Sequence, residues 1–139
     1  MSVVVGLSLM TAGGTASADE SPKAESRKNL PPLMTHDLVG IAGKEAIMLT
    51  VEYGPGESSR PHRHDANVFV YVLEGAITMQ VQGSPAVTLH AGQTFYESPS
   101  DIHAVSQNAS KTAPAKFLVF MVRDKGTPVT RPVAADDLR

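Results

Sequence analysis

Two histidines one residue apart, His62 and His64, are the side chains of this 139-residue sequence best suited to chemistry. They follow a turn-rich segment that begins at Gly54 and they precede an apolar run. Residues i and i+2 of a strand point to the same side, about 6.5 Å apart along the backbone, so both imidazoles can bind one metal ion. A solvated or hydrogen-bonded histidine pair fits the same pattern. Further ligands must therefore be sought elsewhere in the chain.

Composition limits the kind of site and the kind of partner. The chain has no cysteine, which excludes thiolate nucleophiles, zinc–thiolate sites and iron–sulfur ligation. Any metal must bind nitrogen and oxygen atoms. The net charge is −2 and the isoelectric point is about 6.2, and no basic stripe is present, so neither nucleic acid nor a membrane is expected as partner. We expect a small-molecule ligand or substrate.

The first eighteen residues are typical of a signal peptide. An apolar run at 3–10 is followed by Ala16-Ser17-Ala18, although a positively charged start is missing. The run is shorter than the ~20 residues of a membrane span, and an ordinary apolar strand is the alternative. We predict a signal peptide at 1–18, a flexible arm at 19–32, and a bacterial periplasmic or secreted protein.

The rest of the chain has the pattern of an all-β domain. Short apolar or alternating runs are separated by Gly, Pro and Asn turns, and no helical period with caps occurs between 41 and 122. This pattern predicts a β-sandwich or barrel, which we place at 33–125, followed by a polar tail at 126–139. At this length a single domain is expected.

Particular side chains are expected in the core of this domain. The continuous apolar run 68–73 predicts a strand covered on both faces. Phe69 and Tyr71 of this run, and Phe95 of a later strand, are expected in the core. His36 has apolar neighbours and is expected to pack, whereas His90 alternates with polar residues and is expected to be exposed.

The two-histidine segment resembles the first motif of the cupins. Gly56, His62, His64 and Gly75 stand at the spacings of that motif. The motif's glutamate is missing, because Val68 stands at its position.

A second segment resembles the second cupin motif. Gly92 and His103 are separated by the eleven positions of that motif, while Pro99 is shifted by one and Asn108 is one residue late, with Gln107 in its place. The resemblance covers about 41–122. It implies a cupin-type double-stranded β-helix, or jelly-roll barrel, in which His103 lies beside the other two histidines.

The missing glutamate matters most for the site. The resemblance to metal cupins implies a site of three histidines and one glutamate. Without that glutamate, it leaves His62, His64 and His103 as the predicted metal ligands. Three neutral ligands leave the ion's charge uncompensated and up to three of six positions open. The candidates for the pocket or for orienting the ligands are Asn67, Tyr96, Glu97 and Gln107, of which Glu97 or Asn67 could approach the metal.

These features imply an exported metal-binding cupin. The first hypothesis is a non-haem, dioxygenase-like enzyme that acts on a small oxygen-rich or anionic molecule, with no catalytic residue assigned. The cofactor is one divalent metal ion, with Fe(II) favoured and Mn, Ni, Cu or Zn as alternatives. A non-catalytic periplasmic barrel that binds a metal or small ligand, and a cupin isomerase or lyase, remain open. The resemblance also implies a homodimer.

Overall fold

The computed structural model describes residues 31–138, and this part of the chain is all-β apart from one short 3-10 helix, η1 (Ala135–Leu138). No helix within it is long and apolar enough to cross a membrane. The predicted signal peptide, 1–18, lies outside the described residues, as does the predicted arm except for its last two residues.

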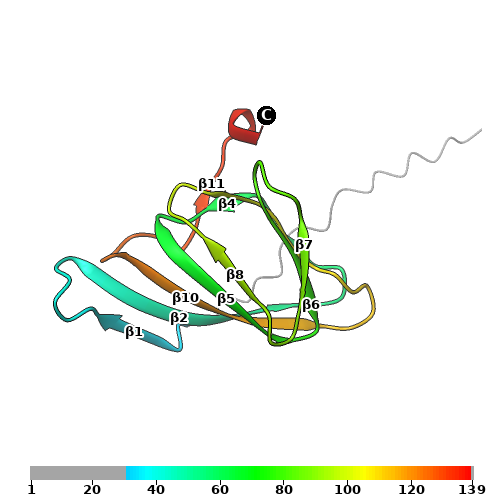
Figure 1. Cartoon of the computed structure of the whole chain (residues 1–139), viewed down its shortest axis with the longest axis horizontal. Coiled ribbons are helices and arrows are strands. Elements are labelled where there is room, and N and C mark those ends of the chain that lie inside the picture. Colours follow the sequence, from blue (N-terminus) through cyan, green and yellow to red (C-terminus); the bar gives the residue numbers. More distant parts are fainter. Residues whose placement is uncertain (1–30, 139) are drawn as a thin grey trace, which may run out of the picture.

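Two antiparallel sheets make up the domain (Figure 1). The first sheet has the order β1 (Met34–Asp37), β2 (Lys44–Tyr53), β10 (Ala115–Asp124), β5 (Ala66–Glu74) and β8 (Thr94–Glu97). The second has the order β11 (Arg131–Pro132), β4 (His62–Arg63), β9 (Ile102–Asn108), β6 (Ala76–Val81) and β7 (Val87–His90), with β3 (Ser58–Ser59) paired to β9.

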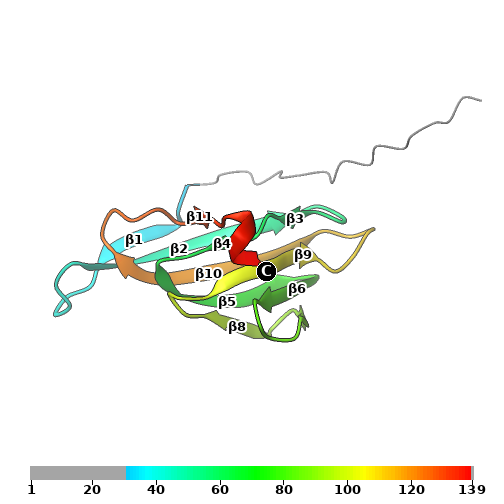
Figure 2. The same cartoon turned by 90° about the horizontal axis from the view of Figure 1, so that it is seen from above.

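The chain alternates between the sheets, so strands distant in sequence become neighbours. Figure 2 shows β10 running between β2 and β5, to both of which it is paired. This two-sheet arrangement with almost no helix is the predicted double-stranded β-helix, and the fold prediction is confirmed.

The core lies between the two sheets, and the strands alternate across it. In β5, Val68, Val70 and Val72 are buried, while Phe69 and Tyr71 are 46% and 45% exposed. The prediction that 68–73 is covered on both faces was therefore wrong, as was the placement of Phe69 and Tyr71 in the core. No layer of residues 31–138 covers the outer face of the first sheet at these positions, so the strand is half-buried despite its continuous apolar run.

Other core predictions have mixed outcomes. Phe95 is partly buried and packs against the core, and His90 is exposed as predicted. His36 is exposed on the edge strand β1, where its Nδ1 lies 2.7 Å from the carbonyl oxygen of Asp37, so the expectation that it packs was wrong. All four residues of β1 are exposed, so neither face of this strand packs on the core.

Gly75 makes the corner between β5 and β6, which carry the chain from one sheet to the other. Its φ is +71°, and an added Cβ would lie 2.6 Å from the carbonyl oxygen of Pro114. A side chain at this position would meet both a strained backbone and a backbone clash. The glycine that closes the first motif is thus required by the corner itself.

The C-terminal tail lies against the barrel. β11 pairs with β4, Val129 packs against the core, and the Gln82 side chain donates to the Asp137 carbonyl oxygen at 2.9 Å. In Figure 1 this segment, orange to red, passes beside β4 at one end of the barrel. The tail therefore covers the barrel end at which the histidines lie.

Candidate metal centre

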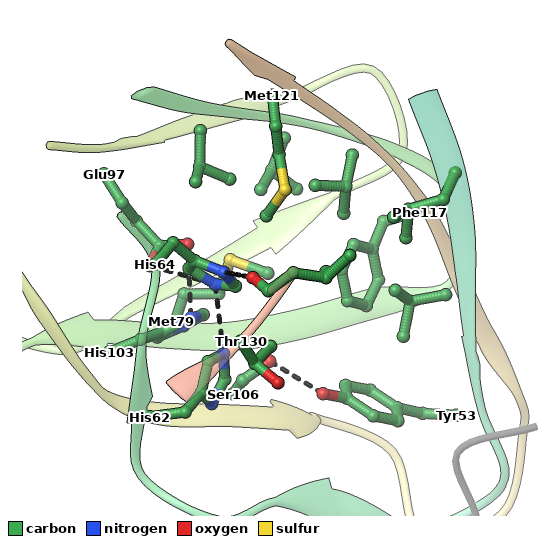
Figure 3. A pocket seen from close by; sticks show the side chains of 16 residues that line it. Tyr53, His62, His64, Met79, Glu97, His103, Ser106, Phe117, Met121 and Thr130 are labelled. Carbon is green, nitrogen blue, oxygen red and sulfur yellow. Dashed lines mark hydrogen bonds and ion pairs between the residues drawn. The ribbon is translucent and has the colours of Figure 1, made fainter. Parts of the chain in front are cut away.

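Three histidines converge inside the barrel, at the end covered by the tail (Figure 3). His62 on β4 is the direct cross-strand partner of His103 on β9, and His64 follows β4 in the link to β5. All three are buried, and one nitrogen atom from each lies within 4.8 Å of the others. The three imidazoles can hold a metal ion.

Backbone carbonyl groups fix the orientation of two of the rings. The Nδ1 of His62 lies 2.8 Å from the carbonyl oxygen of Arg60, and the Nδ1 of His64 lies 2.5 Å from that of Val129. Because a carbonyl oxygen only accepts, each Nδ1 carries a proton, and Nε2 is then the nitrogen of each ring that can bind a metal when the ring is neutral. The two Nε2 atoms are 3.1 Å apart. Two nitrogens bound at ~2.1 Å to one ion at a right angle are about 3.0 Å apart, so the spacing fits a shared metal.

Glu97, at the end of β8, is the fourth polar side chain of the cluster. It is only 2% exposed, its Oε1 lies 3.2 Å from the Nδ1 of His103, and its Oε2 lies 3.8 Å from the Nε2 of His64. Within residues 31–138, neither Oε2 nor either ring nitrogen of His103 has a hydrogen-bond partner. Buried polar atoms are normally satisfied, and a cation among these groups would satisfy them.

The other predicted pocket residues lie elsewhere. The Tyr96 hydroxyl donates to the Asn67 side-chain oxygen at 2.7 Å on the outside of the barrel, where Tyr96 is half exposed. Gln107 is exposed on β9. Of the four candidates, only Glu97 lines the cavity described next. The alternation of side chains along β8 explains the difference between two of them: Phe95 and Glu97 point into the barrel, whereas Tyr96 points outward.

A cavity of about 60 Å³ adjoins the histidines. One water needs about 10–15 Å³, so it holds a few waters or a small molecule. Figure 3 shows the histidines and Glu97 on one side and Tyr53 and Phe117 on the other. The remaining lining residues are Leu49, Val51, Val68, Val70, Met79, Ser106, Val119, Met121, Val129 and Thr130.

Several of these residues were missed by the sequence analysis. The Tyr53 hydroxyl and the Ser106 Oγ are buried and hydrogen-bonded to each other at 2.8 Å. Val129 and Thr130 come from the tail. Inward parity on a strand would have indicated the first two, but nothing in the polar tail predicts that it returns to the site.

A surface hollow of about 450 Å³ borders the other side of His62. Arg60 and Arg131 contribute to its wall, and both are exposed. The guanidinium of Arg131 also pairs with the Asp65 carboxylate at 2.5 Å. Arg60 therefore supplies the positive charge beside His62, because the charge of Arg131 is compensated by Asp65.

The fold and this site define a small β-barrel with a buried cluster of three histidines. The family model described as "Cupin domain" matches residues 49–121. The chain belongs to the cupin family. A search among curated proteins found no match.

Solved structures with the same fold include enzymes. A DMSP lyase, DddQ, from Ruegeria pomeroyi is 20% identical, with a TM-score of 0.54 over 60% of this chain and 41% of that one. An oxalate oxidase in complex with the substrate analogue glycolate is 23% identical, with a TM-score of 0.55 over 66% of this chain and 50% of that one. This chain thus spans half or less of the length of these enzymes.

A double-stranded β-helix protein from Klebsiella pneumoniae, described as uncharacterized, is closer to it in size. It is 16% identical, with a TM-score of 0.53 over 75% of this chain and 88% of that one. At these identities the likeness concerns the fold.

Proposed function

We propose that this chain is an exported, metal-dependent cupin enzyme of the dioxygenase-like kind, which acts on a small oxygen-rich or anionic molecule. The observation that carries the proposal is the convergence of three buried imidazoles on a small cavity. A catalytic metal site keeps positions for water and substrate, whereas a structural site is closed by protein ligands. One divalent ion is the proposed cofactor, with Fe(II) favoured and Mn, Ni, Cu or Zn as alternatives.

When bound, such an ion supplies Lewis-acid chemistry and, if it is iron, redox chemistry. The chain supplies position and a dry environment. The carbonyl groups of Arg60 and Val129 hold the rings of His62 and His64 toward one point. The mostly apolar walls exclude bulk water, which strengthens electrostatic attraction between the site and a bound substrate.

Two features support a small anionic substrate. The cavity of about 60 Å³ admits only a few non-hydrogen atoms. Arg60 borders the hollow next to His62, and positive charge beside a site raises the local concentration of anions. The size and the charge together favour a short carboxylate.

Metal analysis followed by an oxygen-uptake assay tests this proposal. The protein from Asp19 onward is expected to contain close to one divalent ion per chain, and a His103→Ala variant should lose it. Metal-loaded protein is then offered oxalate, glycolate and DMSP, the small molecules named for the structural neighbours. Oxygen uptake that depends on the bound metal would support the proposed dioxygenase-like activity. A folded protein that binds no divalent ion even after reloading would exclude it.

A non-catalytic binding barrel is the second candidate. It is favoured by the pairing of Tyr53 with Ser106, since these two hydroxyl groups of the cavity wall satisfy each other. Tight binding of a carboxylate to the metal-loaded protein without any product would support this candidate. Product formation without oxygen uptake would instead indicate an isomerase or lyase.

We also propose export and cleavage near Ala18, on the basis of the apolar run and the Ala16-Ser17-Ala18 site. A bacterial host that expresses the whole chain should yield a periplasmic or secreted protein that begins at Asp19. Mass spectrometry of the fractionated cells measures this. An intact N-terminus in the cytoplasm would contradict it.

A homodimer through the outer face of the first sheet is the proposed assembly. Phe69 and Tyr96 are cross-strand partners on this face, and with Tyr71 they are 45–50% exposed. Grouped exposed aromatic residues of this kind mark interaction surfaces. Light scattering after size exclusion should give a dimer mass for the wild type and a monomer mass for Phe69→Glu. A monomeric wild type would exclude the pairing.

A further inference from the structure

The cross-strand ladder between β5 and β8 pairs Val68 with Glu97. Val68 stands where the first motif has its glutamate, and both side chains point into the barrel, with exposures of 1% and 2%. Directly opposed residues of an antiparallel pair have Cβ atoms about 4.5–5.5 Å apart on the same face. A carboxylate on residue 97 therefore enters the same interior space as a carboxylate on residue 68 would.

The Glu97 carboxylate lies among groups that a cation would join. Its two oxygens approach the imidazoles of His103 and His64 at 3.2 and 3.8 Å. Among the described residues, no lysine or arginine lines this cavity. A buried carboxylate needs a positive partner, because burial without one is costly. A metal ion held by the histidines would be that partner.

We propose that Glu97 is the fourth protein ligand of the metal, so that the carboxylate is supplied from the strand next to the one that carries the motif position. The inference rests on the proposed metal site and adds one ligand to it. The site then has three nitrogen ligands and one anionic oxygen ligand, which suits Fe(II) or Mn(II) better than three imidazoles alone. In six-coordinate geometry two positions are left for substrate and water, and one unit of the ion's charge is compensated.

A positioning role for Glu97 is the competing explanation. A carboxylate often accepts a hydrogen bond from the outer nitrogen of a metal-bound histidine and thereby orients the ring. The 3.2 Å contact with His103 is close enough, but the His103 Nδ1 has no hydrogen-bond partner within residues 31–138. The contact is thus not aligned as an orienting hydrogen bond, and this favours direct ligation.

Calorimetric titration of the metal-stripped full chain with Mn²⁺ tests the proposal. Glu97→Gln keeps the size of the side chain and removes its charge, and it should weaken Mn²⁺ binding by more than ~100-fold, beyond the ~10–100-fold effect of an orienting residue. The double variant Val68→Glu with Glu97→Val returns the carboxylate to the motif position, and it should recover the affinity to within about tenfold of wild type.

The thermal unfolding midpoint of the metal-free proteins is a second measurement. It should respond differently if Glu97 has only a structural role. Metal-free Glu97→Gln should melt at or above the wild-type temperature, because the change removes a buried carboxylate that has no lysine or arginine beside it in the cavity. Glu45→Gln is the matched control: Glu45 is also a buried carboxylate of the first sheet, but it pairs with Arg123 at 3.0 Å away from the cavity. This control should lower the midpoint and leave Mn²⁺ affinity unchanged.

The outcomes separate this inference from the proposed function. A wild type that binds no divalent metal overturns both. Metal binding that Glu97→Gln weakens by less than about 100-fold, or a folded double variant that recovers nothing, overturns the Glu97 ligand alone and leaves the three-histidine site. If the double variant does not fold, infrared difference spectra decide: Mn²⁺ should shift carboxylate bands in the wild type and in Glu45→Gln, and the shift should be missing in Glu97→Gln.

Discussion

Two cross-strand pairs face the site from opposite sheets, and they differ in whether the sequence motifs contain both of their functional residues. His62 and His103 form the pair in the second sheet, and both belong to recognisable motifs. Val68 and Glu97 form the pair in the first sheet, where the motif residue is apolar and its partner carries the carboxylate. The chemistry of a cross-strand pair therefore depends on which groups enter the shared interior space, and less on which strand supplies them.

The two pairs also differ in what supports them. The ring of His62 is held by the Arg60 carbonyl, and the neighbouring His64 is held by the Val129 carbonyl. The Oε2 of Glu97 has no hydrogen-bond partner among residues 31–138. We expect the rings of His62 and His64 to be ordered before metal binds, and Glu97 and His103, whose ring nitrogens also have no hydrogen-bond partner among residues 31–138, to gain most from the ion.

Removal of a histidine from the second-sheet pair should have the largest effect. His62→Ala should lower divalent-metal affinity by well over ~100-fold, because it removes one of the three histidine ligands. The exposed His90→Ala serves as the control and should bind as the wild type does. Elemental analysis and calorimetry measure both. Equal metal content in His62→Ala and His90→Ala would contradict the second-sheet pair as the basis of the site.

A second carboxylate in the first-sheet pair should be the next largest change. Val68→Glu in the wild-type background places two buried carboxylates opposite each other, which should lower the metal-free unfolding free energy by on the order of 3 kcal/mol. Val68→Gln has a similar size without the charge and controls for packing. Chemical denaturation with and without Mn²⁺ measures the difference. The same loss in both variants would mean that charge is not the cause.

Shortening the tail tests the support of the histidine side. Removal of 127–139 takes away the carbonyl that accepts from His64, so metal affinity should fall by about 10–100-fold. Removal of 134–139 alone keeps Val129 and β11 and should cost much less. Calorimetry compares the two, and circular dichroism checks that each still folds. Identical affinities would show that the tail does not orient the ring.

The smallest predicted effect concerns the wall opposite the site. Tyr53→Phe removes the hydrogen bond to Ser106 and leaves that hydroxyl buried, which should cost about 1–2 kcal/mol of unfolding free energy. Metal affinity should stay unchanged, since this pair is not part of the ligand cluster. Thr78→Val also breaks a hydroxyl pair, but that hydrogen bond is exposed to solvent, so the change should cost less. A change in metal affinity in Tyr53→Phe would extend the site across the cavity.

The local sequence pattern correctly predicted part of the structure. Alternation on strands and turn residues predicted an all-β domain, and the period of two placed His62 and His64 on one side. The motif resemblance added His103, which β9 brings opposite His62. The same local reasoning was wrong for Phe69 and Tyr71, because an apolar side chain does not reveal whether a layer covers it.

The sequence by itself determined the strands, the two histidine motifs and the absence of a motif glutamate, because these depend on residue type and on spacing along the chain. Only the tertiary structure decided that Glu97 lies opposite Val68 and that Val129 reaches His64. Both facts depend on register and on the path of the tail, which pair residues 29 and 65 positions apart. Such pairings follow from how the whole barrel closes, and no single segment encodes them.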